Sequence, residues 1–290
     1  MLQLTQRDTA HAVADYSARV NGVRIRYRES GDPAAPLAVV LHGLMGHARE
    51  WEPLSDALSK TFRVLAVDQR GHGESEWTND YSLQAFADDA LRLFEHMAAG
   101  PVSLIGHSMG GMVAINIAAR RADLVAQLVL IDVGPESLGT QWGRVDLPAR
   151  LDEMRDARFH TVDDAVAEWL AADPLADQRH VRRYLNHALV ATHGGLVWGF
   201  DAKGLSTFPA SVDPEQLWRD VSQIAAPTLV VRGAESTVLS AADSRQLIDE
   251  LPGARLVEIA DGGHDLAVQQ PERVADAVTG FLASGPAFSP

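Results

Sequence analysis

The chain has 290 residues, 46% of them hydrophobic, a formal net charge of −14 and no cysteine. This length can form one large core with an inserted subdomain. The missing cysteine excludes disulfides and thiolate chemistry, and the negative charge argues against nucleic acid or an anionic membrane as a partner. Residues 1–16 lack the apolar core of a signal peptide, and no apolar run could span a bilayer. We therefore expect a cytoplasmic protein; its oligomeric state is left open.

Short β-branched runs alternate with helical stretches over the first part of the chain. In order, the expected strands are 24–29, 37–42, 62–68, 102–105 and 128–132, and the expected helices between them are 51–58, 83–97 and 109–121. After a long interval, strands at 228–232 and 255–259 alternate with helices at 241–251 and 271–282. This alternation predicts an α/β fold, with a mostly parallel central sheet flanked by helices.

The interval between Pro135 and Val221 has a different pattern. No strand is expected there, whereas residues 147–154, 162–170 and 178–190 look helical. We interpret the interval as a helical cap inserted into the sheet domain. The expected organisation is an N-terminal extension at 1–16, a first part of the core at 17–134, the cap at 135–221 and a second part of the core at 222–290.

The sequence Gly106-His107-Ser108-Met109-Gly110 lies between an expected strand and an expected helix. Glycines two positions before and after the serine permit a sharp turn from which its hydroxyl projects, and this turn requires a positive φ at Ser108. The helix behind it directs free backbone N–H groups and the positive end of its dipole toward that hydroxyl. The pattern is typical of a nucleophile that carries an anionic intermediate.

Three other motifs follow expected strands, at the edge of a parallel sheet where ligands bind. They are His42-Gly43, the D-x-R-G-x-G-x-S segment at 68–75, and Gly262-Gly263-His264. Together with the serine turn and the chain order serine, acid, histidine, they resemble the α/β-hydrolase fold superfamily from residue 17 to 283. The resemblance implies a serine hydrolase with a cap, and neither a metal nor a cofactor.

The resemblance also implies roles for single residues. His264 is expected to take the proton of Ser108, because a free serine hydroxyl is a weak nucleophile. The backbone N–H groups of Leu44 and Met109 are expected to form the oxyanion hole. Their side chains remain free to line the pocket.

Four further residues are expected to contact the substrate. His42 and Gly43 lie in the loop beside the nucleophile, and Trp142 and Arg144 lie in the expected cap. We expect these four to touch the substrate, although His42 also suits a role in shaping its loop. The aromatic residues of the cap could cover an apolar substrate or form the core of the cap itself.

The acid departs from the commonest pattern of the superfamily. Many relatives carry an aspartate after the strand that follows the cap, but here Ser236 stands near that position and Glu235 one residue away. Asp132, 24 residues after Ser108, ends an apolar strand instead, as in a subset of the superfamily. An aspartate there is often a turn former, but the gap at Ser236 favours Asp132 as the acid, with Glu235 as the second candidate.

This set of residues predicts a carboxylesterase that forms an acyl-enzyme, with a small carboxylic ester as substrate. Lactones, amides and the C–C bond of vinylogous diketones require the same machinery and stay open as alternatives. A non-catalytic small-molecule receptor on the same fold also stays open. Haloalkane dehalogenation and epoxide hydrolysis are disfavoured, because relatives with those activities carry aspartate where this chain has Ser108.

Overall fold

The computed structural model describes residues 13–97, 100–138 and 147–284. Its main sheet has the strand order β1-β2-β4-β3-β5-β6-β9-β10. The strands are β1 (Ala14–Val20), β2 (Val23–Ser30), β3 (Leu37–Leu41), β4 (Arg63–Asp68), β5 (Val102–His107), β6 (Val125–Ile131), β9 (Thr228–Gly233) and β10 (Arg255–Ile259). Only β2 pairs antiparallel, with β1 and with β4, and all other pairs are parallel. The expected mostly parallel sheet is confirmed.

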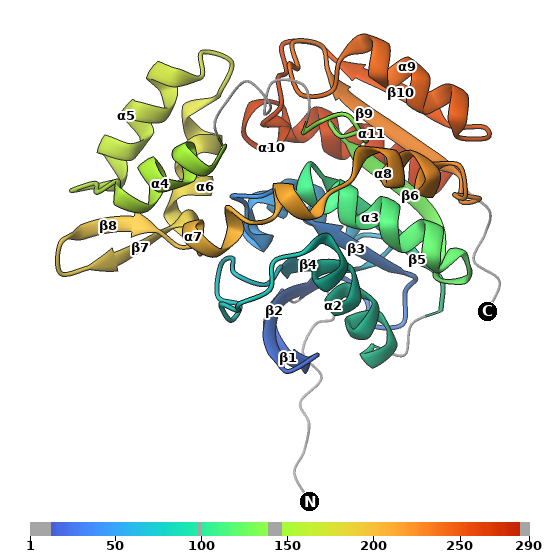
Figure 1. The fold of residues 1–290 in the computed structure, drawn as a ribbon, viewed down its shortest axis with the longest axis horizontal. Coiled ribbons are helices and arrows are strands. Elements are labelled where there is room, and N and C mark those ends of the chain that lie inside the picture. Colours follow the sequence, from blue (N-terminus) through green and yellow to red (C-terminus); the bar gives the residue numbers. More distant parts are fainter. Residues whose placement is uncertain (1–12, 98–99, 139–146, 285–290) are drawn as a thin grey trace, which may run out of the picture.

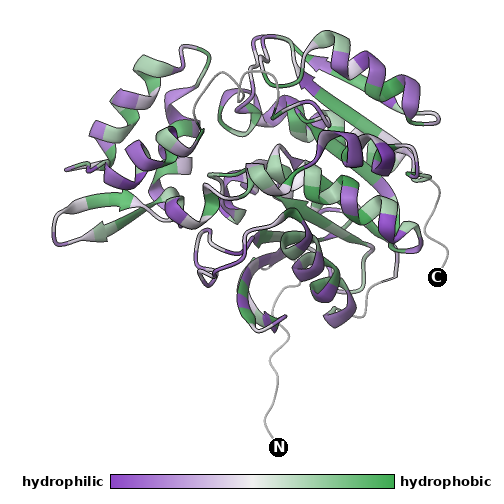
Figure 2. Ribbon diagram, viewed as in Figure 1, coloured by the Kyte–Doolittle hydropathy of each residue, from purple (hydrophilic) through white to green (hydrophobic). Residues whose placement is uncertain are grey.

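Helices cover both faces of this sheet (Figure 1). One face carries α2 (Leu83–His96), α3 (Met109–Arg120), α8 (Pro214–Val221) and α9 (Ala241–Glu250); the other carries α1 (Glu52–Leu58), α10 (Leu266–Gln269) and α11 (Pro271–Ala283). Short 3₁₀ helices lie at η1 (Ala48–Trp51), η2 (Ala122–Leu124) and η3 (Pro209–Ser211). β3 and β5 are buried along their whole length, because helices on both faces exclude water from them. β3 is entirely apolar, β5 also contains Ser103 and His107, and the centre of the sheet is largely hydrophobic (Figure 2).

A second group of elements lies beside the sheet domain (Figure 1). It consists of α4 (Leu147–Asp156), α5 (Val162–Ala172), α6 (Gln178–Ala188) and the hairpin of β7 (Leu189–Thr192) and β8 (Gly195–Trp198). The expectation that no strand lies between Pro135 and Val221 is therefore wrong. Each hairpin strand has four residues, too few for a clear alternation. Gly195, at φ 114°, is the first residue of β8 and directly follows the turn. We keep the name cap for these elements.

The chain returns from the cap to the sheet domain through α7 (Ala202–Leu205). α7 contacts α4, whereas α8 packs on α3. The last helix of the expected insertion at 135–221 therefore lies against the sheet domain.

Strand β1 overlaps the segment expected to be an N-terminal extension. It was not predicted because only Ala18 and Val20 at its end are buried. An Asn-Gly turn at Asn21 and Gly22, both with positive φ, joins it to β2, and this dipeptide is a common hairpin signal. Within the described ranges, no helix combines the length and apolar character that crossing a bilayer requires.

The central strands provide a direct test of this core. Leu104 on β5 is fully buried, whereas Leu175 in the cap is 36% exposed. Leu104→Ala should lower the free energy of unfolding by about 2–5 kcal/mol through lost burial and a residual cavity. Leu175→Ala should change it by less than about 1 kcal/mol. Urea denaturation followed by circular dichroism measures both, and equal losses would contradict this description of the core.

Candidate active site

Ser108 occupies the sharp turn between β5 and α3. Its φ is 51° and its ψ −120°, so the expected positive φ is confirmed. A Cβ atom at Gly106 would collide with the backbone of Gly110, and one at Gly110 would collide with the carbonyl of Leu41. Only glycine fits these two positions, and the hydroxyl of Ser108 consequently stands at the carboxyl edge of the sheet.

The structure brings Ser108, His264 and Asp132 together from distant parts of the chain. Nε2 of His264 lies 3.0 Å from Oγ of Ser108, and Nδ1 lies 2.8 Å from Oδ2 of Asp132. A carboxylate only accepts hydrogen bonds, so Nδ1 carries the proton and Nε2 is left to accept the serine proton. The two contacts form a continuous chain from the hydroxyl to the carboxylate.

The carboxylate of Asp132 is fully buried and accepts two further hydrogen bonds. The N–H of Gly233 donates to Oδ1 at 3.0 Å, and the hydroxyl of Ser236 donates to Oδ2 at 2.5 Å. The sequence located Ser236 at the position where relatives carry an acid, but did not indicate that it donates to the acid on the neighbouring strand. Glu235 is exposed at the surface, turned away from this network.

Two opposing effects set the protonation of His264. Burial would lower its pKa, but the hydrogen bond and charge of Asp132, with a smaller effect of Asp265, raise the pKa above its usual value of 6.5. The imidazole is therefore a stronger base than a free histidine. This is the direction that favours proton transfer from a serine hydroxyl.

The two residues expected to form the oxyanion hole lie on different elements. Leu44 lies in the loop after β3, and Met109 is the first residue of α3, where a backbone N–H has no acceptor within its own helix. Nε2 of His72 contacts the Leu44 carbonyl, and the Tyr184 hydroxyl donates to the Met45 carbonyl at 2.7 Å. These contacts hold the loop from both the sheet domain and the cap.

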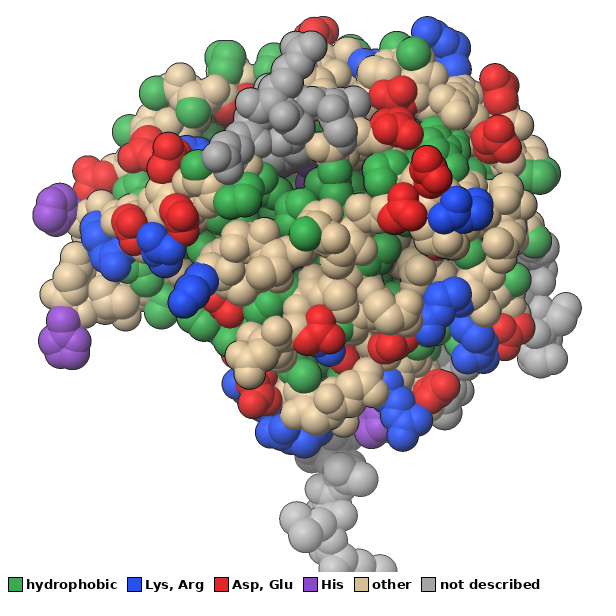
Figure 3. Space-filling model, in the orientation of Figure 1, with side chains coloured by type: hydrophobic (Ala, Val, Ile, Leu, Met, Phe, Trp, Pro, Cys, Tyr) green, Lys and Arg blue, Asp and Glu red, His purple; other side chains and the backbone are tan. Residues whose placement is uncertain are grey.

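A small cavity of about 80 Å³ opens at Ser108. The oxyanion loop at residues 43–46 lines one side, and Trp169 and Tyr184 of the cap line another. Met45, Trp169 and Asp265 also border a second cavity of about 300 Å³ beneath the cap. Apolar side chains gather along this seam between cap and sheet domain (Figure 3).

The expected substrate contacts divide into three groups. Gly43 lines the cavity. His42 does not, because it is fully buried beneath the loop, where Nδ1 lies 2.7 Å from the Gly43 carbonyl and Nε2 accepts the Gln69 N–H. Trp142 and Arg144 lie outside the described residues.

The expected pocket side chains also differ from one another. That of Leu44 borders the cavity, whereas that of Met109 is buried and does not. Trp169, Phe159 and Trp198 line the cavity beneath the cap. The cap aromatics therefore provide both a core for the cap and a wall of its cavity.

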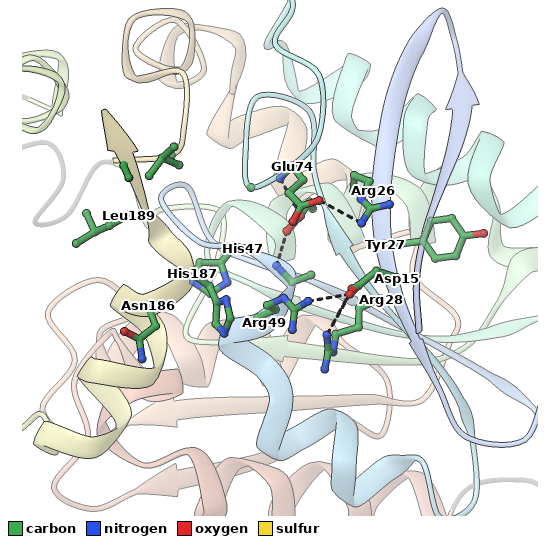
Figure 4. Close-up of a pocket in the computed structure, with 16 residues that line it drawn as sticks. Asp15, Arg26, Tyr27, Arg28, His47, Arg49, Glu74, Asn186, His187 and Leu189 are labelled. Atoms are coloured by element: carbon green, nitrogen blue, oxygen red, sulfur yellow. Dashed lines mark hydrogen bonds and ion pairs between the residues drawn. The ribbon is translucent and has the colours of Figure 1, made fainter. Parts of the chain in front are cut away.

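A separate hollow of about 340 Å³ lies between the hairpin of the cap and strand β2. Its arginines are held by carboxylates: Arg26 by Glu74 at 3.1 Å, Arg28 by Asp15 at 3.4 Å and Arg49 by Asp15 at 2.7 Å (Figure 4). These ion pairs leave no unpaired arginine among the lining residues. In the described part of the chain, no three histidine and acidic side chains are grouped as a metal site.

The sequence matches a family model over residues 38–277, and that model describes the alpha/beta hydrolase family. The chain belongs to the alpha/beta hydrolase family. The relatives reported below are named as hydrolases, and this chain is a hydrolase of the same fold.

Three relatives cover most of this alpha/beta hydrolase. The mouse sn-1-specific diacylglycerol lipase ABHD11 is 30% identical over 266 residues, 87% of this chain and 83% of the mouse protein. Esterase Rv0045c of Mycobacterium tuberculosis is 33% identical over 260 residues, 86% and 83% of the two chains, and one solved structure of it has a TM-score of 0.80, with 27% identity, over 96% and 94% of the chains. A structure of E-2-(acetamidomethylene)succinate hydrolase has a TM-score of 0.84 at 26% identity, covering 94% of this chain and 100% of the other.

The raised pKa of His264 predicts the pH dependence of this hydrolase. If His264 acts as a base, kcat/KM falls as the pH drops through its pKa, so the midpoint of the acid limb should lie above 6.5. Asp265→Asn should lower that midpoint, because it removes a charge that raises the pKa. Initial rates with p-nitrophenyl acetate between pH 5 and pH 9 measure both. A wild-type midpoint below 6.5 would contradict the prediction.

Proposed function

We propose that this protein is a serine hydrolase that cleaves small carboxylic esters through an acyl-enzyme. The observation that carries the proposal is the chain of hydrogen bonds from Oγ of Ser108 through His264 to the buried carboxylate of Asp132. No other serine of the described residues combines a positive φ with a histidine nitrogen at 3.0 Å. This is the arrangement that activates a hydroxyl for attack on a carbonyl.

The first step is acylation. Nε2 of His264 takes the proton of Ser108 as Oγ forms a bond to the ester carbon. The carbonyl oxygen becomes an oxyanion, which the N–H groups of Leu44 and Met109 stabilise. Asp132 stabilises the imidazolium. His264 then passes its proton to the alkoxide as the bond to the alcohol breaks.

The second step is deacylation. His264, neutral again, takes a proton from water while the water oxygen attacks the acyl carbon. A second oxyanion forms in the same place, and its collapse breaks the bond to Oγ of Ser108. The serine recovers its proton from His264, and the carboxylic acid leaves. The enzyme ends the cycle with the same charge that it had at the start, with His264 neutral and Asp132 ionised.

An ester is the favoured substrate because two relatives are named for ester cleavage, one as a lipase and one as an esterase. The small cavity at Ser108 suits a short group on one side of the scissile bond. Lactones, amides and C–C bonds would react through the same steps and serve as comparison substrates. A receptor that binds without turnover is the alternative from another class.

Covalent labelling tests the nucleophile. A fluorophosphonate should add one phosphonyl group to Ser108 and abolish hydrolysis of p-nitrophenyl acetate. Ser108→Ala should escape labelling and lose activity by several orders of magnitude. Intact-mass and peptide mass spectrometry provide the readout. An unlabelled protein without turnover would instead support a receptor, and full activity in Ser108→Ala would overturn the proposal.

The acid is tested by a matched pair of substitutions. Asp132→Asn should lower kcat on the order of 10⁴-fold, the loss seen for this change in a serine protease triad. An asparagine cannot accept all three donors that now meet Asp132, so it loses the charge and misorients His264. Glu235→Gln, on an exposed side chain one residue from Ser236, should change kcat less than about threefold.

Circular dichroism must show that both variants are folded, since Asp132 also joins neighbouring loops. If folded Asp132→Asn keeps near wild-type activity while Glu235→Gln is inactive, the acid lies on the later loop. Asp132 would then be a structural residue only.

A further inference from the structure

The wall of the small cavity contains a carboxyl group that catalysis does not require. Glu50 borders the cavity, is 5% exposed and lies against Gly46 of the oxyanion loop. The His47 N–H donates to it over a long 3.4 Å, and a contact with the Trp51 side chain also acts to lower its pKa. No arginine or lysine of the described residues pairs with it. Burial raises the pKa of Glu50 to about 8, and Asp265 adds to this rise.

A second carboxyl group faces the same space. Asp265 follows His264 and borders both the small cavity and the cavity beneath the cap. Its side chain does not cap helix α10, and within the described ranges no arginine or lysine pairs with it. Burial raises the pKa of this group, although the charge of the neighbouring His264 acts to lower it. The two carboxyls thus border one cavity without an arginine or lysine partner among the described residues.

His107 provides an independent indication of what the cavity would bind. Its ring is 5% exposed, and Nε2 lies 3.0 Å from the carbonyl of His264, so Nε2 carries the hydrogen. Burial, with the neighbouring His264, lowers the pKa of His107 to about 3, and the ring is neutral. Nδ1 is therefore a bare acceptor. It is buried, has no partner among the described residues and lies beside Gly43 in the cavity wall.

With a pKa of about 8, the carboxyl of Glu50 is largely protonated at pH 7 in the absence of a cation, and a cation beside it would favour the carboxylate, which only accepts hydrogen bonds. With both carboxyls ionised, the cavity is rich in acceptors and poor in donors. The hydroxyl of Tyr184 is already used on the Met45 carbonyl, and the N–H groups of Leu44 and Met109 are reserved for the substrate oxygen. The indole N–H of Trp169 is the one side-chain donor on the wall without a partner. Buried acceptors without donors are costly, so a ligand that brings several donors and a positive charge relieves that cost.

We propose that the acyl part of the substrate carries a primary ammonium group, which Glu50, Asp265 and Nδ1 of His107 receive in the small cavity. This rests on the proposed ester hydrolysis. An ammonium has three donors and no acceptor, and the rings of Trp169 and Tyr184 add favourable contacts for a cation. The cavity of about 80 Å³ holds only a few heavy atoms, since one water takes up about 30 Å³. The net charge of −14 also attracts cations.

The test compares methyl esters at pH 7, with proton release as the readout; the ammonium, methyl and hydroxyl esters are of equal size, and the carboxylate ester is larger. β-Alanine methyl ester carries an ammonium where methyl butanoate carries a methyl group. Wild-type kcat/KM, normalised to the rate of alkaline hydrolysis, should be at least about tenfold higher for the ammonium ester. Monomethyl succinate, with a carboxylate, should be poorer than methyl butanoate. The kcat/KM of methyl 3-hydroxypropanoate, which carries a hydroxyl in place of the ammonium, should lie between the values for β-alanine methyl ester and methyl butanoate.

Glu50→Gln keeps the shape of the side chain but cannot ionise to the carboxylate that would pair with the ammonium. The ratio of ammonium ester to methyl butanoate should fall about tenfold in this variant. The matched control is Glu52→Gln, two residues away and paired with Arg28 and Arg49 outside the cavity. In Glu52→Gln, the ratio of kcat/KM for the ammonium ester to that for methyl butanoate should equal the wild-type ratio. Equal ratios in wild type, Glu50→Gln and Glu52→Gln would overturn the proposal, as would a preference for the hydroxyl or carboxylate ester.

A binding measurement separates this proposal from the proposed function. Ser108→Ala cannot form an acyl-enzyme but keeps the cavity wall, and by calorimetry it should bind propylammonium more tightly than 1-propanol or propanoate. If Ser108 is labelled and esters are hydrolysed without a preference for the ammonium ester, the proposed ammonium site is wrong but the proposed hydrolase mechanism stands. If the protein binds propylammonium but Ser108 is not labelled, the hydrolase mechanism is wrong but the ammonium site stands. If Glu50→Gln does not fold, the binding of these three ligands decides the matter.

Discussion

The buried carboxylate of Asp132 is the constraint on which the rest of the site depends. Three donors meet it: the Gly233 N–H, the Ser236 hydroxyl and Nδ1 of His264. They come from the end of β9 and from the loops after β9 and β10, so this one group ties the end of β6 to both later loops. A charge buried without donors would be strongly unfavourable. The positive φ of 48° at Asp132 is part of the geometry that lets a strand end reach all three.

Asp132 also explains why the later loop carries a serine. An acid at position 236 would place a second carboxylate against the first, with repulsion in a region of low dielectric constant. Ser236 instead donates to Asp132 and accepts the N–H groups of Val238 and Leu239, each at 3.2 Å. The acid at the end of β6 and the hydrogen-bond donor after β9 therefore depend on each other. Each residue makes the other favourable.

The cap contacts both loops that the proposed mechanism requires. Tyr184 of α6 donates to Met45, and its own carbonyl accepts Nε2 of His47 at 3.0 Å, with the two rings stacked. At the other side, Gln269 joins Asp173 at the end of α5 to the Gly263 N–H before His264. A shift of the cap would thus move the oxyanion loop and the histidine loop together.

Burial and neighbouring charges decide which histidines near the site stay neutral and which can be protonated. It lowers the pKa of His47 and His107 to about 3 and that of His42 well below its usual value. These rings stay neutral and act as fixed donors and acceptors. Only His264, which faces Asp132, has its pKa raised, so a carboxylate rather than exposure makes this ring the one suited to carry a proton.

The sequence by itself determined what depends on local patterns and short spacings. Apolar β-branched runs gave the parallel sheet, because a strand buried on both faces needs an unbroken apolar run. The glycines around Ser108 predicted its positive φ, because sterics at that turn involve only a few neighbouring residues.

Only the tertiary structure decided which side chains meet across long separations in the chain. It turned His42 away from the cavity, gave Asp132 a donor at Ser236, and placed Glu50 and Asp265 on one wall. It also formed the β7–β8 hairpin, whose strands are too short to show a period. Side-chain direction and pairing depend on how loops from different strands pack, and no local pattern records that packing.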